Sequence, residues 1–385
     1  MVAMTDVWPY VLLYVHDDDV LACALVSRSF RDILWTQQRC MVKHRPLGRF
    51  RILTYPSALT VSAARLRWVH DWCDGKPGWI ASWDAATTAT LAKYGGREAL
   101  EWAADKGGCP VKFSTSVNAT KGGHLEILQW LLHTGHTLSY RLCEEAAAIG
   151  SVKILSWLVT EADLPISLVA ADTAARAGHK DVVQWIYRQG FPMSHEILNY
   201  AAEGGNLELV QWIRDELHRP LSWLTCRGAA AGGHVDVLGW LVDNNCKFDV
   251  DTIYSEAIKG RHPEVIEYMQ SHGHTWPHGA TAIAAMSGSL DILQWAHRDG
   301  CPCTEKTARD AAMGGHVEAL MWLRKNRCEW DEKVCSRAAE YGHLHVLQYA
   351  VANDCPWEPE LCLRQAQSAG FDEIVDWIRQ KVDWL

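Results

Sequence analysis

Long apolar runs and a secretion signal are both missing from this 385-residue chain. No stretch of about 18 consecutive apolar residues occurs, so we expect no membrane-spanning helix. The N-terminus lacks a basic segment followed by an apolar segment and a small-residue cleavage site. We therefore expect a cytoplasmic or nuclear location and 13 reduced cysteines. The net charge of -9 is unlike that of a phosphate-backbone binder. Among partners we expect no nucleic acid and no membrane.

The motifs of common active sites are absent as well. The chain has no phosphate-binding glycine loop, no H-E-x-x-H, no G-x-S-x-G and no paired C-x-x-C sets. Metal binding is conceivable at Cys301 with Cys303 and at His272, His274 and His278, but small buried thiols and surface histidines explain them more simply. We expect no enzyme, no metal and no cofactor. The alternative, an enzyme with a dispersed site, would need a deep pocket lined by convergent titratable groups.

What the chain does have is a repeating aromatic residue, spaced 27 or 28 positions apart from Trp102 to the C-terminus. A period of about 20–50 residues is typical of solenoids, in which each repeat buries its apolar face against its neighbours. We expect these anchors to be fully buried, each contributing about 2–3 kcal/mol. The anchors are Trp102, Trp130, Trp157, Trp185, Trp212, Trp240, Tyr268, Trp295, Trp322, Tyr349 and Trp377.

Two further columns recur at fixed distances from the anchor. An alanine eleven residues before it predicts a first helix pressed closely against its neighbours. A glycine seven residues before it predicts the left-handed end of that helix, with Arg261 as the one exception. The alanines are Ala119, Ala146, Ala174, Ala201, Ala229, Ala257, Ala284, Ala311, Ala338 and Ala366. The glycines are Gly95, Gly123, Gly150, Gly178, Gly205, Gly233, Gly288, Gly315, Gly342 and Gly370.

A second helix follows each glycine. The segment 125–132 places its apolar residues on a broad helical face. Acidic residues such as Glu126 early in this helix complement the positive helix N-terminus. A histidine often follows the glycine, as at His124, and we expect it to form hydrogen bonds at the turn. The predicted repeat is therefore helix, tight turn, helix and short loop, with no strand.

This pattern resembles a divergent ankyrin repeat. The segments beginning Ala311-Ala312-Met313-Gly314-Gly315-His316 and Ala338-Ala339-Glu340-Tyr341-Gly342-His343 share the form A-A-x-x-G-H before an apolar helix. The resemblance is to the tryptophan-containing arrays of large DNA viruses and some algae and oomycetes. It implies helix pairs in an all-α solenoid, located in the host cytoplasm if the protein is viral. These repeats are shorter than the usual 33 residues, so we expect short loops in place of the β-hairpin fingers.

The first 45 residues resemble an F-box. The family's last helix is matched by Val26-Ser27-Arg28-Ser29-Phe30-Arg31, and its acidic turn by Asp18-Asp19-Val20-Leu21. The family's opening Leu-Pro is absent, and Ala3-Met4 lies near its place. The resemblance implies binding of a Skp-type adaptor of a cullin–RING ubiquitin ligase. A small helical cap without a partner is the alternative. The implied adaptor-binding residues are Leu12, Val20, Leu21, Leu25, Val26 and Phe30.

These features predict an F-box-like domain in residues 1–45, a linker and degenerate capping helix in 46–84, and an array of about ten to eleven repeats in 85–385. We expect a substrate-recruiting F-box subunit that holds a protein target on the concave face of the array. The alternative is an ankyrin-type interaction scaffold with no ubiquitin role. Residues that vary just before the alanine column are the candidates for target binding. They are Glu145, Thr173, Tyr200, Glu256, Ile283, Asp310, Arg337 and Gln365.

Overall fold

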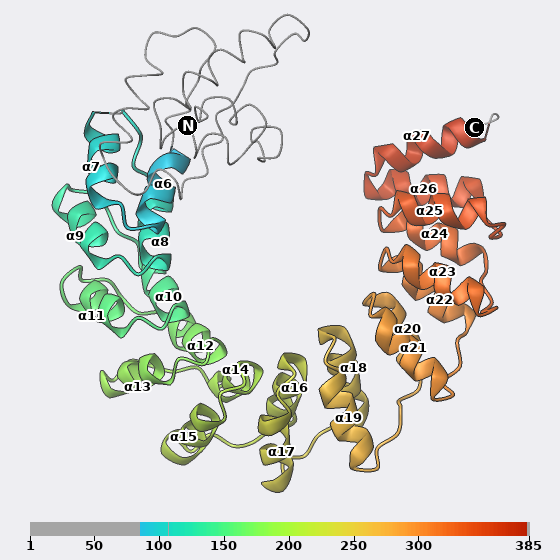
Figure 1. Ribbon diagram of the computed structural model, residues 1–385, viewed down its shortest axis with the longest axis horizontal. Coiled ribbons are helices and arrows are strands. Elements are labelled where there is room, and N and C mark those ends of the chain that lie inside the picture. Colours follow the sequence, from blue (N-terminus) through green and yellow to red (C-terminus); the bar gives the residue numbers. More distant parts are fainter. Residues whose placement is uncertain (1–84, 107, 383–385) are drawn as a thin grey trace, which may run out of the picture. The chain divides into compact units, whose positions relative to one another are not determined.

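The computed structural model describes residues 85–106 and 108–382, and every regular element within these ranges is an α-helix. The helices form eleven consecutive pairs, each with a tight turn inside it and a short loop after it (Figure 1). This confirms the predicted all-α solenoid of helix pairs, and over these residues the loops contain no β-hairpin. The predicted F-box-like domain and capping helix, residues 1–45 and 46–84, lie outside the described residues.

The two helices of each pair are of similar length. The first helices are α6 (Ala85–Lys93), α8 (Phe113–Lys121), α10 (Arg141–Ala148), α12 (Leu168–Arg176), α14 (Ile197–Glu203), α16 (Trp223–Gly232), α18 (Val250–Gly260), α20 (Ala280–Met286), α22 (Glu305–Met313), α24 (Glu332–Glu340) and α26 (Pro359–Ala369). The second helices are α7 (Arg97–Asp105), α9 (Leu125–His133), α11 (Val152–Thr160), α13 (Lys180–Arg188), α15 (Leu207–Leu217), α17 (Val235–Asp243), α19 (Pro263–Ser271), α21 (Leu290–Arg298), α23 (Val317–Lys325), α25 (Leu344–Ala352) and α27 (Asp372–Lys381).

The chain divides into two compact units. Of the described residues, those up to Ala174 and Asp181–Pro192 form the N-terminal unit, and Ala175–Lys180 and those from Met193 onward form the C-terminal unit. Within each unit the first helices pack on one another in chain order, as α6 does on α8 and α14 on α16. Second helices such as α15 and α17 contact one another more sparsely. The first helices therefore form the tighter of the two layers.

The alanine column explains this close packing. All ten alanines are completely buried, with 0% of their surface exposed. Each lies on a first helix, where its small methyl group lets the backbones of neighbouring helices approach closely. The predicted spacing role of alanine is confirmed at every one of these positions.

The aromatic anchors, in contrast, are only half-buried in all eleven repeats. Our expectation that they would be fully buried is wrong. In α9 the completely buried side chains are Ile127, Leu128 and Leu131, which lie three and two residues before the anchor and one after it. The same three positions are buried in α11, α17 and α25. An indole is too large to be enclosed between two short helices, so one edge remains at the surface while aliphatic residues form the core.

The predicted helix-ending glycines are confirmed. All ten have positive φ angles, from 68° at Gly288 to 84° at Gly342. The exception also conforms, because Arg261 adopts the same left-handed conformation with φ of 60°. Its guanidinium donates hydrogen bonds to the carbonyls of Ser287 (3.3 Å) and Gly288 (3.0 Å) in the next repeat.

The histidine after this glycine bonds to the preceding repeat rather than to its own turn. Nε2 of His124 lies 3.1 Å from the carbonyl oxygen of Lys93. The equivalent distance is 3.1 Å for His234 to Glu203, and 3.0 Å for His343 to Met313. Asn206, at the same position in its repeat, donates instead to the carbonyl of the turn glycine Gly178, at 2.8 Å. These bonds satisfy carbonyls at the ends of first helices, which have no partner within the helix.

This geometry predicts the effect of substituting a bonding histidine. We expect His234→Ala to lower the free energy of unfolding by about 1 kcal/mol, because the Glu203 carbonyl loses its partner. His234→Asn should lose less, because the asparagine at the equivalent position, Asn206, donates to another carbonyl of the preceding repeat and so keeps one hydrogen bond between the repeats. Urea unfolding of the two variants beside the parent chain measures the difference. Equal losses in both variants would show that packing of the ring, rather than its hydrogen bond, is responsible.

Candidate ligand-binding surface

All eight residues predicted to bind a target lie on first helices. Arg337 is exposed, and the other seven are half-buried. Several are already engaged with neighbours. Glu145 lies 3.5 Å from Nζ of Lys121 on the preceding first helix. The ring of Tyr200 lies 4.5 Å beneath the guanidinium of Arg176, and its hydroxyl donates to Glu196 at 3.0 Å.

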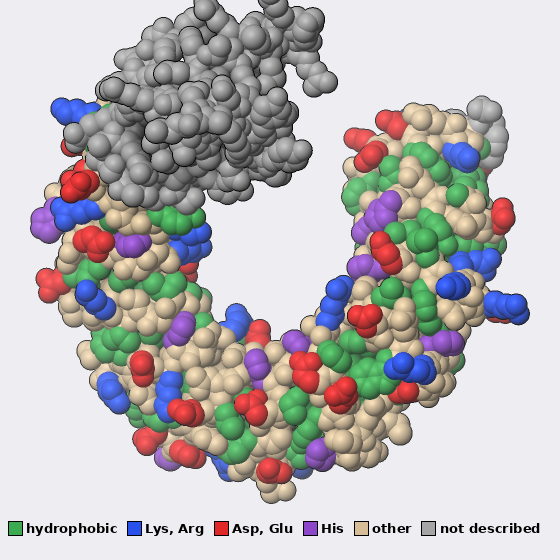
Figure 2. Space-filling view, viewed as in Figure 1, with side chains coloured by type: hydrophobic (Ala, Val, Ile, Leu, Met, Phe, Trp, Pro, Cys, Tyr) green, Lys and Arg blue, Asp and Glu red, His purple; other side chains and the backbone are tan. Residues whose placement is uncertain are grey.

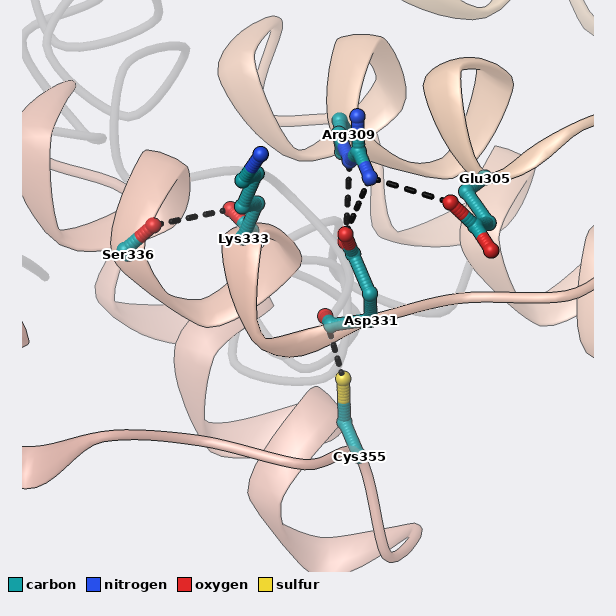
Figure 3. Close-up of polar contacts among 6 residues, drawn as sticks. All are labelled: Glu305, Arg309, Asp331, Lys333, Ser336 and Cys355. Atoms are coloured by element: carbon teal, nitrogen blue, oxygen red, sulfur yellow. Dashed lines mark hydrogen bonds and ion pairs between the residues drawn. The ribbon is translucent and has the colours of Figure 1, made fainter.

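Charged residues near the middle of the first helices thus hold neighbouring repeats together. Figure 3 shows the clearest case, in which Arg309 of α22 pairs with Glu305 of its own helix at 3.0 Å and with Asp331 ahead of α24. The hydrogen bond to Asp331 raises the pKa of Arg309. Next to it, burial raises the pKa of Asp310 despite three nearby cations. Because these groups are part-solvated, each pair stabilises the fold only slightly.

Exposed large side chains recur at or just before the first turn of the first helices, seventeen residues before the anchor. We call this row the loop edge and define it by Phe113, Tyr140 and Leu168 in the N-terminal unit and Trp223 and His278 in the C-terminal unit. The exposed fractions are 43% for Phe113, 46% for Tyr140, 47% for Leu168 and 49% for Trp223. Large apolar side chains on a surface are typical of binding sites when they recur in one place.

Two hollows lie beside the loop edge at the same position in the repeat. In the N-terminal unit, a hollow of about 230 Å³ is lined by Phe113, His136 and Ser139. In the C-terminal unit, a larger hollow of about 610 Å³ is lined by His278 and Cys301 among others. His136 and Cys301 both lie six residues after their anchors, so both hollows form between successive inter-repeat loops.

Aromatic contacts stiffen the larger hollow. Trp276 packs against Tyr254 in a tilted arrangement and against Trp295 edge to face, at centroid distances of 5.5 and 5.3 Å. Its indole nitrogen donates to Oδ2 of Asp299 at 2.9 Å, and this bond lowers the pKa of that carboxyl. Gln270 adds a second bond to the same oxygen, at 3.3 Å. Asp299 therefore ties the two loops together.

The residues weighed as metal ligands lie at this hollow or near it. His274 and His278 line the hollow with Cys301. His272 instead packs on Tyr268, and the thiol of Cys303 lies 3.5 Å from Nδ1 of His297. Across residues 85–106 and 108–382, no three His, Cys, Asp or Glu side chains are arranged to hold a metal ion. Over the same residues, no helix is long and apolar enough to cross a membrane.

The loop edge was missed from the sequence because its residue types change along the array. In the last six repeats, this position is occupied in turn by Trp223, Asp251, His278, Glu305, Glu332 and Glu360. A search for repeat positions whose residue type varies identifies the half-buried positions as readily as the loop edge. Only the combination of variation with large apolar residues in the first repeats would have singled this column out.

Comparisons with known proteins give matches among solved structures only. No family model and no curated protein matches the chain. Among solved structures, the pentatricopeptide repeat protein PPR10 in complex with an 18-nt psaJ RNA element is 15% identical, with a TM-score of 0.33 over 95% of this chain. PPR10 from maize is 14% identical, with a TM-score of 0.34 over 96% of this chain. The chain covers 63% and 64% of the PPR10 chain in these two structures. A likeness of this extent does not indicate what the chain binds.

Our expectation about partners is corrected at one point, the exclusion of nucleic acid. We expected a protein target and a Skp-type adaptor and excluded nucleic acid, yet a helical repeat protein among the matches holds an RNA. The exclusion rested on the net charge of the whole chain, which does not describe a local surface. In the view of Figure 2, acidic and basic side chains are interspersed over the described surface. A single-strand ligand can be held by aromatic rings as well as by cations.

Proposed function

We propose that the chain is a binding scaffold in which the loop edge of the N-terminal unit holds an extended macromolecular ligand. The observation that carries the proposal is the row formed by Phe113, Tyr140 and Leu168, which are 43–47% exposed, beside the hollow lined by Phe113. Rigid aromatic side chains supply large contact area at a low entropic cost. The ring faces of Phe113 and Tyr140 suit either the side chains of a polypeptide or the bases of a single-stranded RNA.

The surrounding architecture supports this role. The alanine and glycine columns fix the spacing of successive first helices, so the loop edge is presented on a rigid support. Several charged residues of these helices are paired with one another, as Lys121 is with Glu145. They contribute a polar rim around the apolar contacts. We further propose that the chain binds without catalysing a reaction.

A selection experiment tests the proposal on the full chain. The immobilised protein is exposed to a random-peptide display library and, separately, to a random single-stranded RNA pool. We expect one pool to be enriched. The enriched ligands should lose about ten-fold in affinity for each of Phe113→Ala, Tyr140→Ala and Leu168→Ala, because each removes an exposed apolar side chain worth about 1–2 kcal/mol.

Matched controls on second helices separate a site from general surface stickiness. Tyr187 on α13 is 43% exposed and Met321 on α23 is 51% exposed. Tyr187→Ala and Met321→Ala should leave the affinity unchanged. No enrichment from either pool, or equal losses in the loop-edge and control variants, would overturn the proposal.

A narrower form of the function is a substrate-recruiting subunit of a cullin–RING ubiquitin ligase, built on an ankyrin-like array. It depends on the F-box-like residues 1–45 and stays a prediction. Leu25, Val26 and Phe30 are the residues that it singles out. In the native cell, a polypeptide fused to an enriched peptide should become ubiquitinated, and Phe30→Ala should abolish this. Unchanged ubiquitination in that variant would leave the plain scaffold, which binds without a ubiquitin role.

A further inference from the structure

Cysteines occupy two positions of the repeat that the fold brings together. One position lies fourteen residues before the anchor, on the first helix, and is occupied by Cys143, Cys226 and Cys335. The other lies six residues after the anchor, in the inter-repeat loop, and includes Cys246 and Cys355. A repeat with cysteine at both positions has two thiols twenty residues apart in sequence.

In the repeat containing α16 and α17, these two thiols touch. The sulfur atoms of Cys226 and Cys246 are 2.9 Å apart, and both side chains are buried. A disulfide needs a separation of about 2.05 Å, so the sulfurs must approach by only about 0.9 Å. The thiol of Cys246 also donates to the carbonyl of Ser222 at 3.2 Å, which holds the loop over the start of α16.

The second repeat of this kind has a similar arrangement. Cys335 on α24 is hydrogen-bonded to Cys355, whose thiol lies 3.4 Å from the Asp331 carbonyl (Figure 3). Cys143 provides the contrast, because Asp163 takes the place of the loop cysteine in its repeat. The pairing thus follows from the register of the repeat.

We propose that Cys226 and Cys246 form an oxidisable thiol pair that closes to a disulfide in the presence of hydrogen peroxide. The hydrogen bond from Cys226 lowers the pKa of Cys246 and raises that of Cys226. Cys246 is thereby the nucleophile, and it is also the more accessible of the two, 6% against 0% exposed. A thiolate is the reactive form of cysteine.

The chemistry proceeds in two steps. The Cys246 thiolate attacks one peroxide oxygen, the O–O bond breaks, and the products are a sulfenic acid and, after protonation of hydroxide, water. The Cys226 sulfur then attacks the Cys246 sulfur, its proton leaves with the hydroxyl group as a second water, and the S–S bond forms. Overall, two thiols are oxidised by two electrons and one peroxide molecule is reduced to two waters.

The test is mass spectrometry of the full chain after peroxide treatment, denaturation and alkylation. We expect a linked peptide pair containing Cys226 and Cys246, lighter than the two thiol peptides by two hydrogen atoms and cleaved by a reductant. Cys226→Ala or Cys246→Ala should abolish it, whereas Cys143→Ala should not. Cys143 itself should be recovered fully alkylated.

Thermal unfolding supplies a second measurement. The disulfide should raise the unfolding midpoint of the parent chain, because it constrains the unfolded state, and a reductant should reverse the increase. Recovery of both cysteines as free thiols, conversion of Cys246 to a sulfinic acid without a linked peptide, or linkage of Cys246 to another cysteine would each overturn the proposal. These outcomes are read on the parent chain, so they hold even if a variant fails to fold.

Discussion

Gly232→Ala is expected to lower the free energy of unfolding by about 2–3 kcal/mol, whereas Gly239→Ala in the next helix raises it by about 0.5–1 kcal/mol. Gly232 ends α16 against the preceding repeat. A Cβ there would meet the carbonyl oxygen of Glu203 too closely for either atom to remain in place, and it would lie 2.6 Å from Cδ2 of His234. The carbonyl is also the one that His234 binds. The added methyl group therefore displaces both the packing and the hydrogen bond.

Gly239 is the matched control because the same substitution meets no obstacle there. It lies inside α17, and a Cβ would make an ordinary contact with the Tyr268 hydroxyl at 3.6 Å. Alanine has the higher helix propensity, which accounts for the expected gain. Urea unfolding of the full chain gives the stabilities, and amide hydrogen exchange in α14 to α17 locates the change. If both variants shift stability in the same direction, the close approach of the backbones is not what glycine provides at Gly232.

Equivalent repeats show how the array responds to a larger residue at this position. Tyr341 and Ile149 stand where Gly232 stands in its repeat. Nevertheless, His343 still reaches the Met313 carbonyl, at 3.0 Å. The interface between two repeats can therefore accommodate a larger residue at this position when the surrounding residues differ as well. At Gly232 we expect a loss of stability because the Glu203 carbonyl and the His234 ring lie against the glycine and must move to admit a methyl group.

The periodic columns made most of the fold predictable from the sequence. Alanine and positive-φ glycine each answer a local steric demand that recurs in every repeat, so each leaves a visible column. Arg261 shows how strong this local demand is, since a residue other than glycine adopts the same left-handed conformation there. The histidine bonds could not be predicted in the same way. Their acceptor, such as the Lys93 carbonyl for His124, lies 31 residues away and is fixed only by how repeats stack.

The candidate site was less predictable for a related reason. Positions that pack are constrained to one residue type, but positions that bind can vary freely, and so can positions that are merely solvated. The sequence led to Glu145 and Tyr200, which vary and yet are engaged with Lys121 and Arg176. Phe113 and Trp223 vary in the same manner and are exposed. Only the three-dimensional surroundings of a side chain separate these cases.

Ala146→Leu is expected to have the largest effect, a loss of about 3 kcal/mol in the free energy of unfolding. Ala146 is completely buried on α10, in the column that brings neighbouring first helices together. Leucine would add three carbon atoms where no space exists, so α10 must move away from α8. Ala148→Leu is the control, because Ala148 ends the same helix and is half-buried. That change should stay within about 0.5 kcal/mol.

The consequence should reach beyond stability. Moving α10 displaces Tyr140, the loop-edge residue that immediately precedes this helix. Ala146→Leu should therefore weaken an enriched ligand under conditions where the chain remains folded, while Ala148→Leu should not. Circular dichroism during urea unfolding and titration of the ligand at low urea measure the two effects on the same samples. Equal stability of the two variants would mean that the alanine column does not set the spacing of the first helices.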